Sequence, residues 1–324
     1  MTRRVRTSVV SFLVYSIGLL TACKSDPGTN AEAMVGPEVC EVPVVLAALP
    51  DELFEVSGII RDPRLQDLFW VHNDSGNDPA IYGINLSGEI VAVVPIAGAS
   101  NRDVEDIAIG PCPDGDCLYL ADIGDNLAVH ASVVIQRLPL PGLPASAGAE
   151  IIDYSPIEPN ATWRLVYEDG PRDSESLVVD AERSELVVVS KGRNNEIVLY
   201  AIPLADLHDG LVETDTLRRI GRLRLPIGTS TSQFVTAADL SPDASTLGVR
   251  SYSTFYEFAW EGSATFDTAT VPGWASLFYA REAQGEGLSW DRSGETVLLV
   301  SEGRGGTPPS LSRMGCPAGE SSTK

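Results

Sequence analysis

Glu105-Asp106-Ile107-Ala108-Ile109-Gly110 and Glu175-Ser176-Leu177-Val178-Val179-Asp180 are two copies of one short pattern. Each copy begins with small or acidic residues, continues as an apolar run and usually ends in an acidic turn, which is typical of a β-strand. Three further copies start at Ser57, Ala238 and Glu286. Recurrence of one strand pattern along a chain predicts a fold built from repeated units.

Further β-rich runs follow each copy, separated by Gly, Pro, Asp and Asn turns. The second runs are 68–72, 118–122, 186–191, 246–251 and 296–302, and the third are 80–85, 133–138, 197–202, 254–260 and 310–316. Fourth runs are 90–96, 163–167, 217–225 and a segment within 264–280. Repeated four-stranded antiparallel units are propeller blades. We therefore expect an all-β fold, a β-propeller of five blades, with a six-bladed ring containing one degenerate blade as the alternative.

The last unit has no fourth strand of its own. Residues 40–49 form a spare β-rich segment at the start of the chain. If this segment completes the last blade, the ring closes and leaves no open sheet edge between its ends. The expected propeller domain spans 39–317, followed by a disordered tail at 318–324.

The N-terminus has the features of an export signal. Arg3, Arg4 and Arg6 precede an apolar stretch at 9–20, which is short for a membrane span. Leu20-Thr21-Ala22-Cys23 follows and resembles a bacterial lipobox. We expect a lipoprotein signal peptide at 1–22, lipidation of Cys23 and a flexible tether at 23–38. The protein would then be extracytoplasmic and anchored in the cell envelope, at the outer membrane or cell surface.

Four cysteines remain besides Cys23, and an even number suits disulfides in an oxidising compartment. Cys112 and Cys117 flank the turn Pro113-Asp114-Gly115-Asp116, so they are placed to staple a hairpin. Cys40 and Cys316 would then join the two ends of the domain. Two other pairings, and free buried thiols, remain open at this point.

The composition limits the classes of partner. The formal net charge is −22, and removing 1–22 takes away three arginines and no acid, which leaves 20 basic against 45 acidic residues. Such a chain repels nucleic acid and suits cations. The 44% hydrophobic content fits a core-forming domain, which we expect to be a monomer.

Propeller geometry converts the repeats into a candidate site. The first strand of each blade lines the central channel, so the starts of first strands and the ends of second strands meet at one mouth. Acids from several blades would converge there, and like carboxylates repel unless something neutralises them. Hard oxygen ligands at this density suit Ca²⁺. The predicted metal ligands are Glu105, Asp106, Asp122, Asp125, Glu175, Asp239 and Glu286. The predicted ligand-binding residues are Asn73, Asp74, Lys191, Arg250, Tyr252 and Glu302.

Catalytic roles are assigned to His72, Glu105 and Glu175. His72 is the one histidine in a site-like position, and it could be a base, a metal ligand or a structural residue. The acids could equally cap strands or bond backbone amides without binding a ligand. No Gly-x-Ser-x-Gly or His-Glu-x-x-His motif occurs in the sequence.

Several short stretches resemble the bacterial phytase-like, or esterase-like, β-propeller family. They are 286–291 with 300–303, 103–108, 173–177, and 70–76. The resemblance implies Ca²⁺ held by Glu105, Asp106, Glu175, Asp239 and Glu286, with Lys191 and Arg250 contacting phosphate.

Three functional hypotheses follow. The first is an envelope binding module that holds a cation or small polar ligand at the acidic mouth. The second is a Ca²⁺-dependent hydrolase of phosphate or carboxylic esters, in which metal-bound water attacks. The third is a protein-interaction platform that uses the outer faces of the propeller for an envelope partner.

Overall fold

The computed structural model describes residues 39–99, 101–142, 151–193, 196–225, 234–263, 273–277 and 280–316. Contacts divide the chain into units at 1–33 and 34–324, and every described residue belongs to the second unit. The predicted signal peptide, Cys23, the tether and the tail at 318–324 lie outside the described residues. In the described part, no helix is long and apolar enough to cross a membrane.

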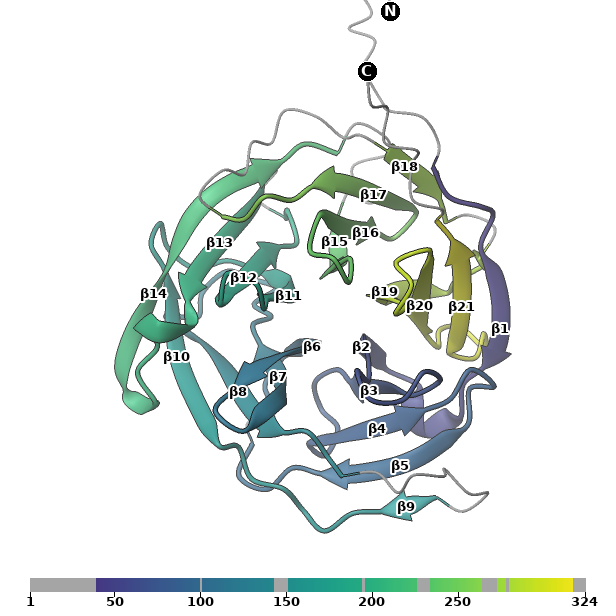
Figure 1. The fold of residues 1–324 in the computed structure, drawn as a ribbon, viewed down its shortest axis with the longest axis horizontal. Coiled ribbons are helices and arrows are strands. Elements are labelled where there is room, and N and C mark those ends of the chain that lie inside the picture. Colours follow the sequence, from purple (N-terminus) through teal and green to yellow (C-terminus); the bar gives the residue numbers. More distant parts are fainter. Residues whose placement is uncertain are drawn as a thin grey trace, which may run out of the picture. The chain divides into compact units, whose positions relative to one another are not determined.

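The described residues form five blades around a central channel, as the sequence predicts (Figure 1). The innermost strands are β2 (Val56–Arg61), β6 (Val104–Cys112), β11 (Ser174–Asp180), β15 (Val235–Leu240) and β19 (Gln284–Trp290). The second strands are β3 (Phe69–Asn73), β7 (Gly115–Asp122), β12 (Glu185–Ser190), β16 (Thr246–Ser251) and β20 (Thr296–Glu302). Each innermost strand contacts the innermost strands of the two neighbouring blades, so the ring is closed.

The outer strands complete the blades. The third strands are β4 (Ala80–Ile84), β8 (Val133–Pro139), β13 (Ile197–Pro203), β17 (Thr254–Ala259) and β21 (Ser310–Gly315). The fourth are β5 (Ile90–Pro95), β10 (Ala161–Tyr167), β14 (Gly210–Leu223), β18 (Gly273–Ser276) and, for the last blade, β1 (Val44–Ala48). The hydrophobic residues of these strands pack between neighbouring blades, and Trp70, Tyr119 and Tyr256 are among the fully buried ones.

Ring closure occurs as the sequence predicts. β1 pairs antiparallel with β21, with Val44 opposite Arg313. The disulfide Cys40–Cys316 joins the two ends of the domain across 276 residues. Linking positions so far apart restricts the unfolded chain strongly, so this bridge stabilises the closed ring.

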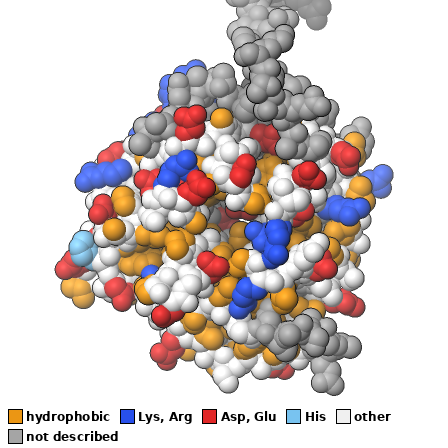
Figure 2. Space-filling model, viewed as in Figure 1, with side chains coloured by type: hydrophobic (Ala, Val, Ile, Leu, Met, Phe, Trp, Pro, Cys, Tyr) orange, Lys and Arg blue, Asp and Glu red, His pale blue; other side chains and the backbone are white. Residues whose placement is uncertain are grey.

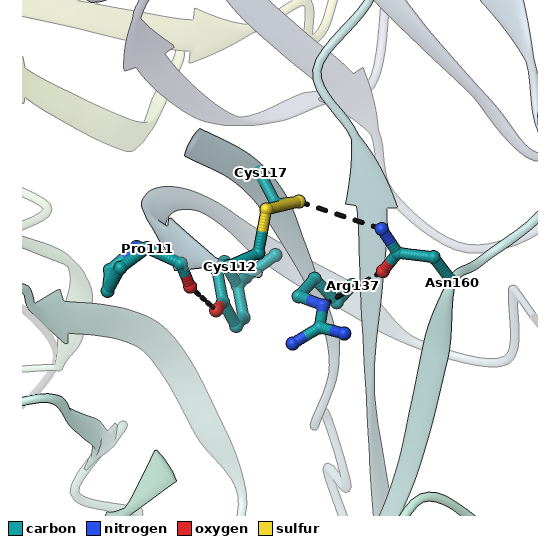
Figure 3. Close-up of a disulfide and its surroundings, with 6 residues drawn as sticks. Pro111, Cys112, Cys117, Arg137 and Asn160 are labelled. Atoms are coloured by element: carbon teal, nitrogen blue, oxygen red, sulfur yellow. Dashed lines mark hydrogen bonds between the residues drawn. A yellow bond between two sulfur atoms is a disulfide. The ribbon is translucent and has the colours of Figure 1, made fainter. Parts of the chain in front are cut away.

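The second predicted disulfide, Cys112–Cys117, staples the β6–β7 hairpin. Its surroundings tie the hairpin to the outer strands (Figure 3). Asn160 Nδ2 lies 3.6 Å from Cys117 Sγ, and Arg137 Nε donates to Asn160 Oδ1 at 2.8 Å.

Two features of the outer edge were not predicted. A short strand, β9 (Ile152–Asp153), adds to the first blade parallel to β5. The strand β14 pairs parallel with β10, which joins the second and third blades into one eight-stranded sheet. The short β9 and the long β14 thus cover edges that would otherwise be open.

Candidate functional site

Every innermost strand contains a β-bulge close to its start. The register shifts fall between Val56 and Ile59, Val104 and Asp106, Ser174 and Ser176, Val235 and Ala237, and Gly285 and Leu288. A bulge leaves a residue unpaired and re-aims its side chain. The equivalent bulge residues are Ser57, Glu105, Glu175, Thr236 and Glu286. Three of the five are glutamates, and all five lie at the end of the channel where the innermost strands begin. We call this end the acidic mouth.

The acidic mouth brings carboxylates from different blades together. Oxygens of Asp74, Asp103 and Glu105 lie within 4.8 Å of one another, and so do oxygens of Glu105, Asp173 and Glu175. Glu105 belongs to both groups and is only 7% exposed. Glycine at position 124 leaves room for the two carboxylates. A Cβ atom there would lie 2.3 Å from Glu105 Oε1 and 2.5 Å from Asp103 Cγ, so any other residue would clash with them.

Burial and mutual repulsion raise the pKa of these acids. Burial, with Glu175 and Asp74 nearby, raises the pKa of Glu105 well above its usual value. Burial and the charge of Asp74 raise the pKa of Asp103 to about 6. The same causes raise the pKa of Glu302 to about 7. Glu286 is raised well above its usual pKa by burial and by Glu175. Burial and clustering therefore disfavour the ionised form of these acids.

One buried ammonium group lies among these acids. Lys191 Nζ donates to Glu175 Oε1 at 2.5 Å and lies 5.9 Å from the ring centre of Tyr252. Burial opposes the charge of Lys191, but Glu175 and its neighbours outweigh burial and raise the pKa of the ammonium group. Burial and Glu286 raise the pKa of the Tyr252 phenol to about 12, so it stays protonated at neutral pH.

The carboxylates of Asp74, Asp103 and Glu105 have Lys191 as an electrostatic neighbour but not as a direct ion-pair partner. Within the described residues, none of the three makes an ion pair, and Asp74 Oδ1 accepts the Ser75 N–H at 2.5 Å. Glu286, 4% exposed, has an Oε2 atom that is buried with no hydrogen-bond partner among the described residues. Its strongest electrostatic neighbours are Glu175, Lys191 and Glu302, so the atom belongs to the same site. A buried acceptor without a donor is costly unless a ligand satisfies it.

Asp106 and Asp239 instead accept backbone N–H groups and so connect neighbouring innermost strands. Asp106 accepts the N–H of Ile107 and, from the next blade, that of Leu177, both at 2.8 Å. Asp239 accepts the N–H of Leu240 at 2.8 Å and of Trp290 at 3.0 Å. Each aspartate thus bonds to its own strand and to the adjacent innermost strand.

Asp239 does not lie at the acidic mouth. Its Cα partner is Gly248, three residues beyond the bulge residue Thr236. The repeat pattern in the sequence started the fourth copy at Ala238. In the structure, the residue of the fourth blade that is equivalent to Glu105 is Thr236, two residues earlier. The pattern failed here because Val235-Thr236-Ala237 contains no acid.

Asp122 and Asp125 hold loops in place. The Asp122 carboxylate accepts the N–H groups of Arg102 and Asp103 at 3.4 and 3.2 Å. Asp125 Oδ2 accepts the N–H of His130 at 2.6 Å. Both side chains position the loops that carry Asp103 and Gly124, and neither joins the two carboxylate groups described above.

Two other predicted site residues, His72 and Asn73, are buried in the framework. His72 Nε2 accepts the Gly58 N–H at 3.1 Å and Nδ1 lies 3.0 Å from Asn73 O, and burial lowers the pKa of His72 to about 4. A neutral ring with both nitrogens engaged is structural. Asn73 Nδ2 donates to Glu52 O at 2.8 Å.

Arg250 is fully buried and bridges the fourth and fifth blades. Its Nη1 donates to Gly287 O at 2.9 Å and Val300 O at 3.2 Å, and its Nη2 donates to Glu282 Oε2 at 2.6 Å. It is therefore not available to contact phosphate.

Sequence reasoning missed Asp103, Asp173 and Arg193 as site residues. Asp173 Oδ1 accepts the Asp125 N–H at 3.0 Å, and Oδ2 accepts Arg193 Nε at 2.5 Å. A signal for the two acids was present: Asp103-Val104-Glu105 and Asp173-Ser174-Glu175 repeat an Asp two residues before the bulge Glu.

Comparisons with known proteins add little to this description. No family model matches the chain, and no curated protein matches it. Among solved structures, a gluconolactonase from Xanthomonas campestris is similar with a TM-score of 0.42 and 13% identity, over 87% of this chain and 97% of that one. The chain is thus a five-bladed β-propeller by its own strand topology. The comparisons do not support the resemblance to the phytase-like family.

Proposed function

We propose that this protein is a binding module whose acidic mouth holds a divalent cation, with Ca²⁺ the first choice. The group formed by Asp74, Asp103 and Glu105 carries the proposal, because its oxygens lie within 4.8 Å of one another and form no direct ion pair among the described residues. Carboxylate oxygens are the ligands that Ca²⁺ prefers. The buried, unpartnered Oε2 of Glu286 supports a ligand at the same mouth.

The second carboxylate group is a weaker candidate for the cation. Lys191 already pairs with Glu175, and Arg193 pairs with Asp173. Lys191 and Arg193 form ion pairs in this second group, whereas Asp74, Asp103 and Glu105 form none among the described residues. We therefore place the cation nearer to Asp103 than to Glu175.

Calorimetric titration of the protein with Ca²⁺ and with Mg²⁺ tests the proposal. We expect saturable binding of Ca²⁺ that Glu105→Gln weakens by tenfold or more. Glu213→Gln is the matched control, because the Glu213 side chain is 64% exposed and its ion pair among the described residues is with His208. Absence of binding of either cation to the wild type would refute the cation site.

A second candidate function is cation-assisted hydrolysis of phosphate or carboxylic esters. Asp103 favours it, because a carboxylate with a pKa of about 6 is suited to accept a proton near neutral pH. A phosphate substrate is disfavoured, because Lys191 already pairs with Glu175 and Arg250 already donates to Gly287 O. Release of nitrophenol from nitrophenyl acetate or phosphate with Ca²⁺, abolished by Asp103→Asn, would establish hydrolysis. Ca²⁺ binding without turnover would favour the binding module.

We further propose that the protein is exported and anchored through lipid on Cys23. Leu20-Thr21-Ala22-Cys23 supports the anchor, and the two disulfides fit an oxidising compartment. Metabolic labelling with palmitate tests it: Cys23→Ser should lose both the label and the membrane association. A labelled Cys23→Ser protein would contradict the proposal.

A further inference from the structure

A cavity of about 210 Å³ lies where the innermost strands end, opposite the acidic mouth. All five blades line it. Five of its lining residues occupy the same place in their strands, each four residues after the bulge residue: Arg61, Ile109, Val179, Leu240 and Trp290. Figure 2 shows the surface viewed along the ring axis, where basic and acidic side chains are interspersed around the centre. We call this cavity the apolar mouth.

The lining is apolar with few charged groups. Besides the ring of five, Ile60, Pro63 and Pro242 add carbon surface. Two carboxylates also line it. Asp239 uses its oxygens to accept backbone N–H groups, and Glu182 is 64% exposed and lies 3.7 Å from Arg183. Arg61 is the one cation among the residues that line the cavity.

Arg61 has no carboxylate within ion-pair distance among the described residues, although Asp239, Asp291 and Asp62 are near enough to favour its charge. Its Nη1 donates to Asp62 O at 3.3 Å, but its Nε is buried with no acceptor among the described residues. It forms no ion pair within 4.0 Å in the described part of the chain, whereas its neighbour Arg64 pairs with Asp62 at 2.7 Å. Burial lowers the pKa of Arg61, which measures the cost of holding this charge away from water.

We propose that the apolar mouth binds a small monocarboxylate with an apolar body, whose carboxylate pairs with Arg61 and whose body packs against Ile109, Val179 and Leu240. A guanidinium matches a carboxylate geometrically and electrostatically. A cationic ligand would be repelled by Arg61.

The size of the cavity fits such a ligand. An apolar cavity of about 150 Å³ holds benzene. The larger apolar mouth therefore accommodates a benzene ring with a carboxylate attached. The inference does not depend on the proposed cation site, since the two mouths share no side chain.

Titration of the full chain with benzoate, followed by calorimetry and by saturation-transfer NMR, tests the proposal. We expect saturable benzoate binding that Arg61→Leu weakens by tenfold or more, because a charge-assisted contact is lost. Arg313→Leu, on the exposed outer part of β21, is the matched control and should bind as the wild type does. Benzamide, which has the same ring without the charge, should bind wild type and Arg61→Leu alike.

A second variant separates the cavity from the charge. Ile109→Phe fills the cavity while Arg61 is kept, and it should abolish binding of both benzoate and benzamide. Near-ultraviolet circular dichroism checks that each variant is folded, and Glu105→Gln should bind benzoate normally. The proposal is overturned if wild type does not bind benzoate, or if Arg61→Leu or Ile109→Phe binds it as tightly as wild type.

Discussion

The two mouths of the channel are built from the same five strands, yet their chemistry is opposite. At the strand starts, bulges present Glu105, Glu175 and Glu286. Four residues further along the same strands, the equivalent residues are Ile109, Val179 and Trp290. A repeated backbone thus supplies two rings of positions, and the residues at each ring decide whether it collects charge or apolar surface.

The arginines sharpen the contrast. Arg250 is fully buried, and its two terminal nitrogens have acceptors in the fifth blade or on Glu282. Arg61, at the apolar mouth, has no carboxylate partner within the described residues. One arginine holds blades together, whereas the other is available to a ligand.

The largest expected effect compares these two arginines. Arg250→Met should lower the free energy of unfolding by about 3–5 kcal/mol, because it leaves Glu282 buried without its partner. Arg61→Met should change it by less than about 1 kcal/mol, because no ion pair is lost. Urea unfolding measures both. Equal losses would show that Arg61 is as structural as Arg250.

The next largest expected effect is the stabilisation of the folded state by Ca²⁺, compared between a variant at each mouth. At a Ca²⁺ concentration of about 100 times Kd, the folded state should gain about 2.7 kcal/mol. Thermal unfolding should show the gain in wild type and in Asp239→Asn, whose side chain lies away from the acidic mouth, but not in Glu105→Gln. If Asp239→Asn removed the Ca²⁺ effect as fully as Glu105→Gln, the assignment of the cation to one mouth would fail.

The smallest effect is the pH dependence of stability. Glu302, with a folded pKa of about 7, and the more strongly raised Glu105 and Glu286 bind protons more tightly when folded than when unfolded. Their contribution is full below the unfolded pKa and is lost as pH rises through the folded pKa. With chelator present, the free energy of unfolding should therefore fall by on the order of 1 kcal/mol between about pH 6.5 and 8.

His72 contributes little to the change in stability between about pH 6.5 and 8. The pKa of that ring is lowered to about 4, so it opposes the trend of the acids only as pH falls below its unfolded value. Ca²⁺ should reduce the loss at high pH, since the cation favours the ionised carboxylates. A stability that rises from pH 6.5 to 8 in chelator would contradict strong repulsion at the acidic mouth.

Local patterns in the sequence were sufficient for the five blades and the closure of the ring, but not for β9 or the parallel pairing of β10 with β14. Strand-forming runs and turn residues recur, so the blades could be counted, and the spare segment at 40–49 predicted the closing strand β1. The turn between Cys112 and Cys117 predicted the hairpin disulfide, which left Cys40 and Cys316 to join the ends. These features depend on neighbours in sequence or on the need to cover sheet edges, and both can be read without coordinates.

Only the tertiary structure decided which acids meet. A shift of three residues along a strand moves a carboxylate about 10 Å, at roughly 3.3 Å per residue, and this separates Asp239 from Glu105. Whether an acid is free or bonded to backbone N–H groups also depends on the adjacent blade, as with Asp106 and Leu177. The same holds for the two arginines. Strand register and blade packing give Arg250 its acceptors and leave Arg61 without an ion pair, and no local sequence pattern encodes either.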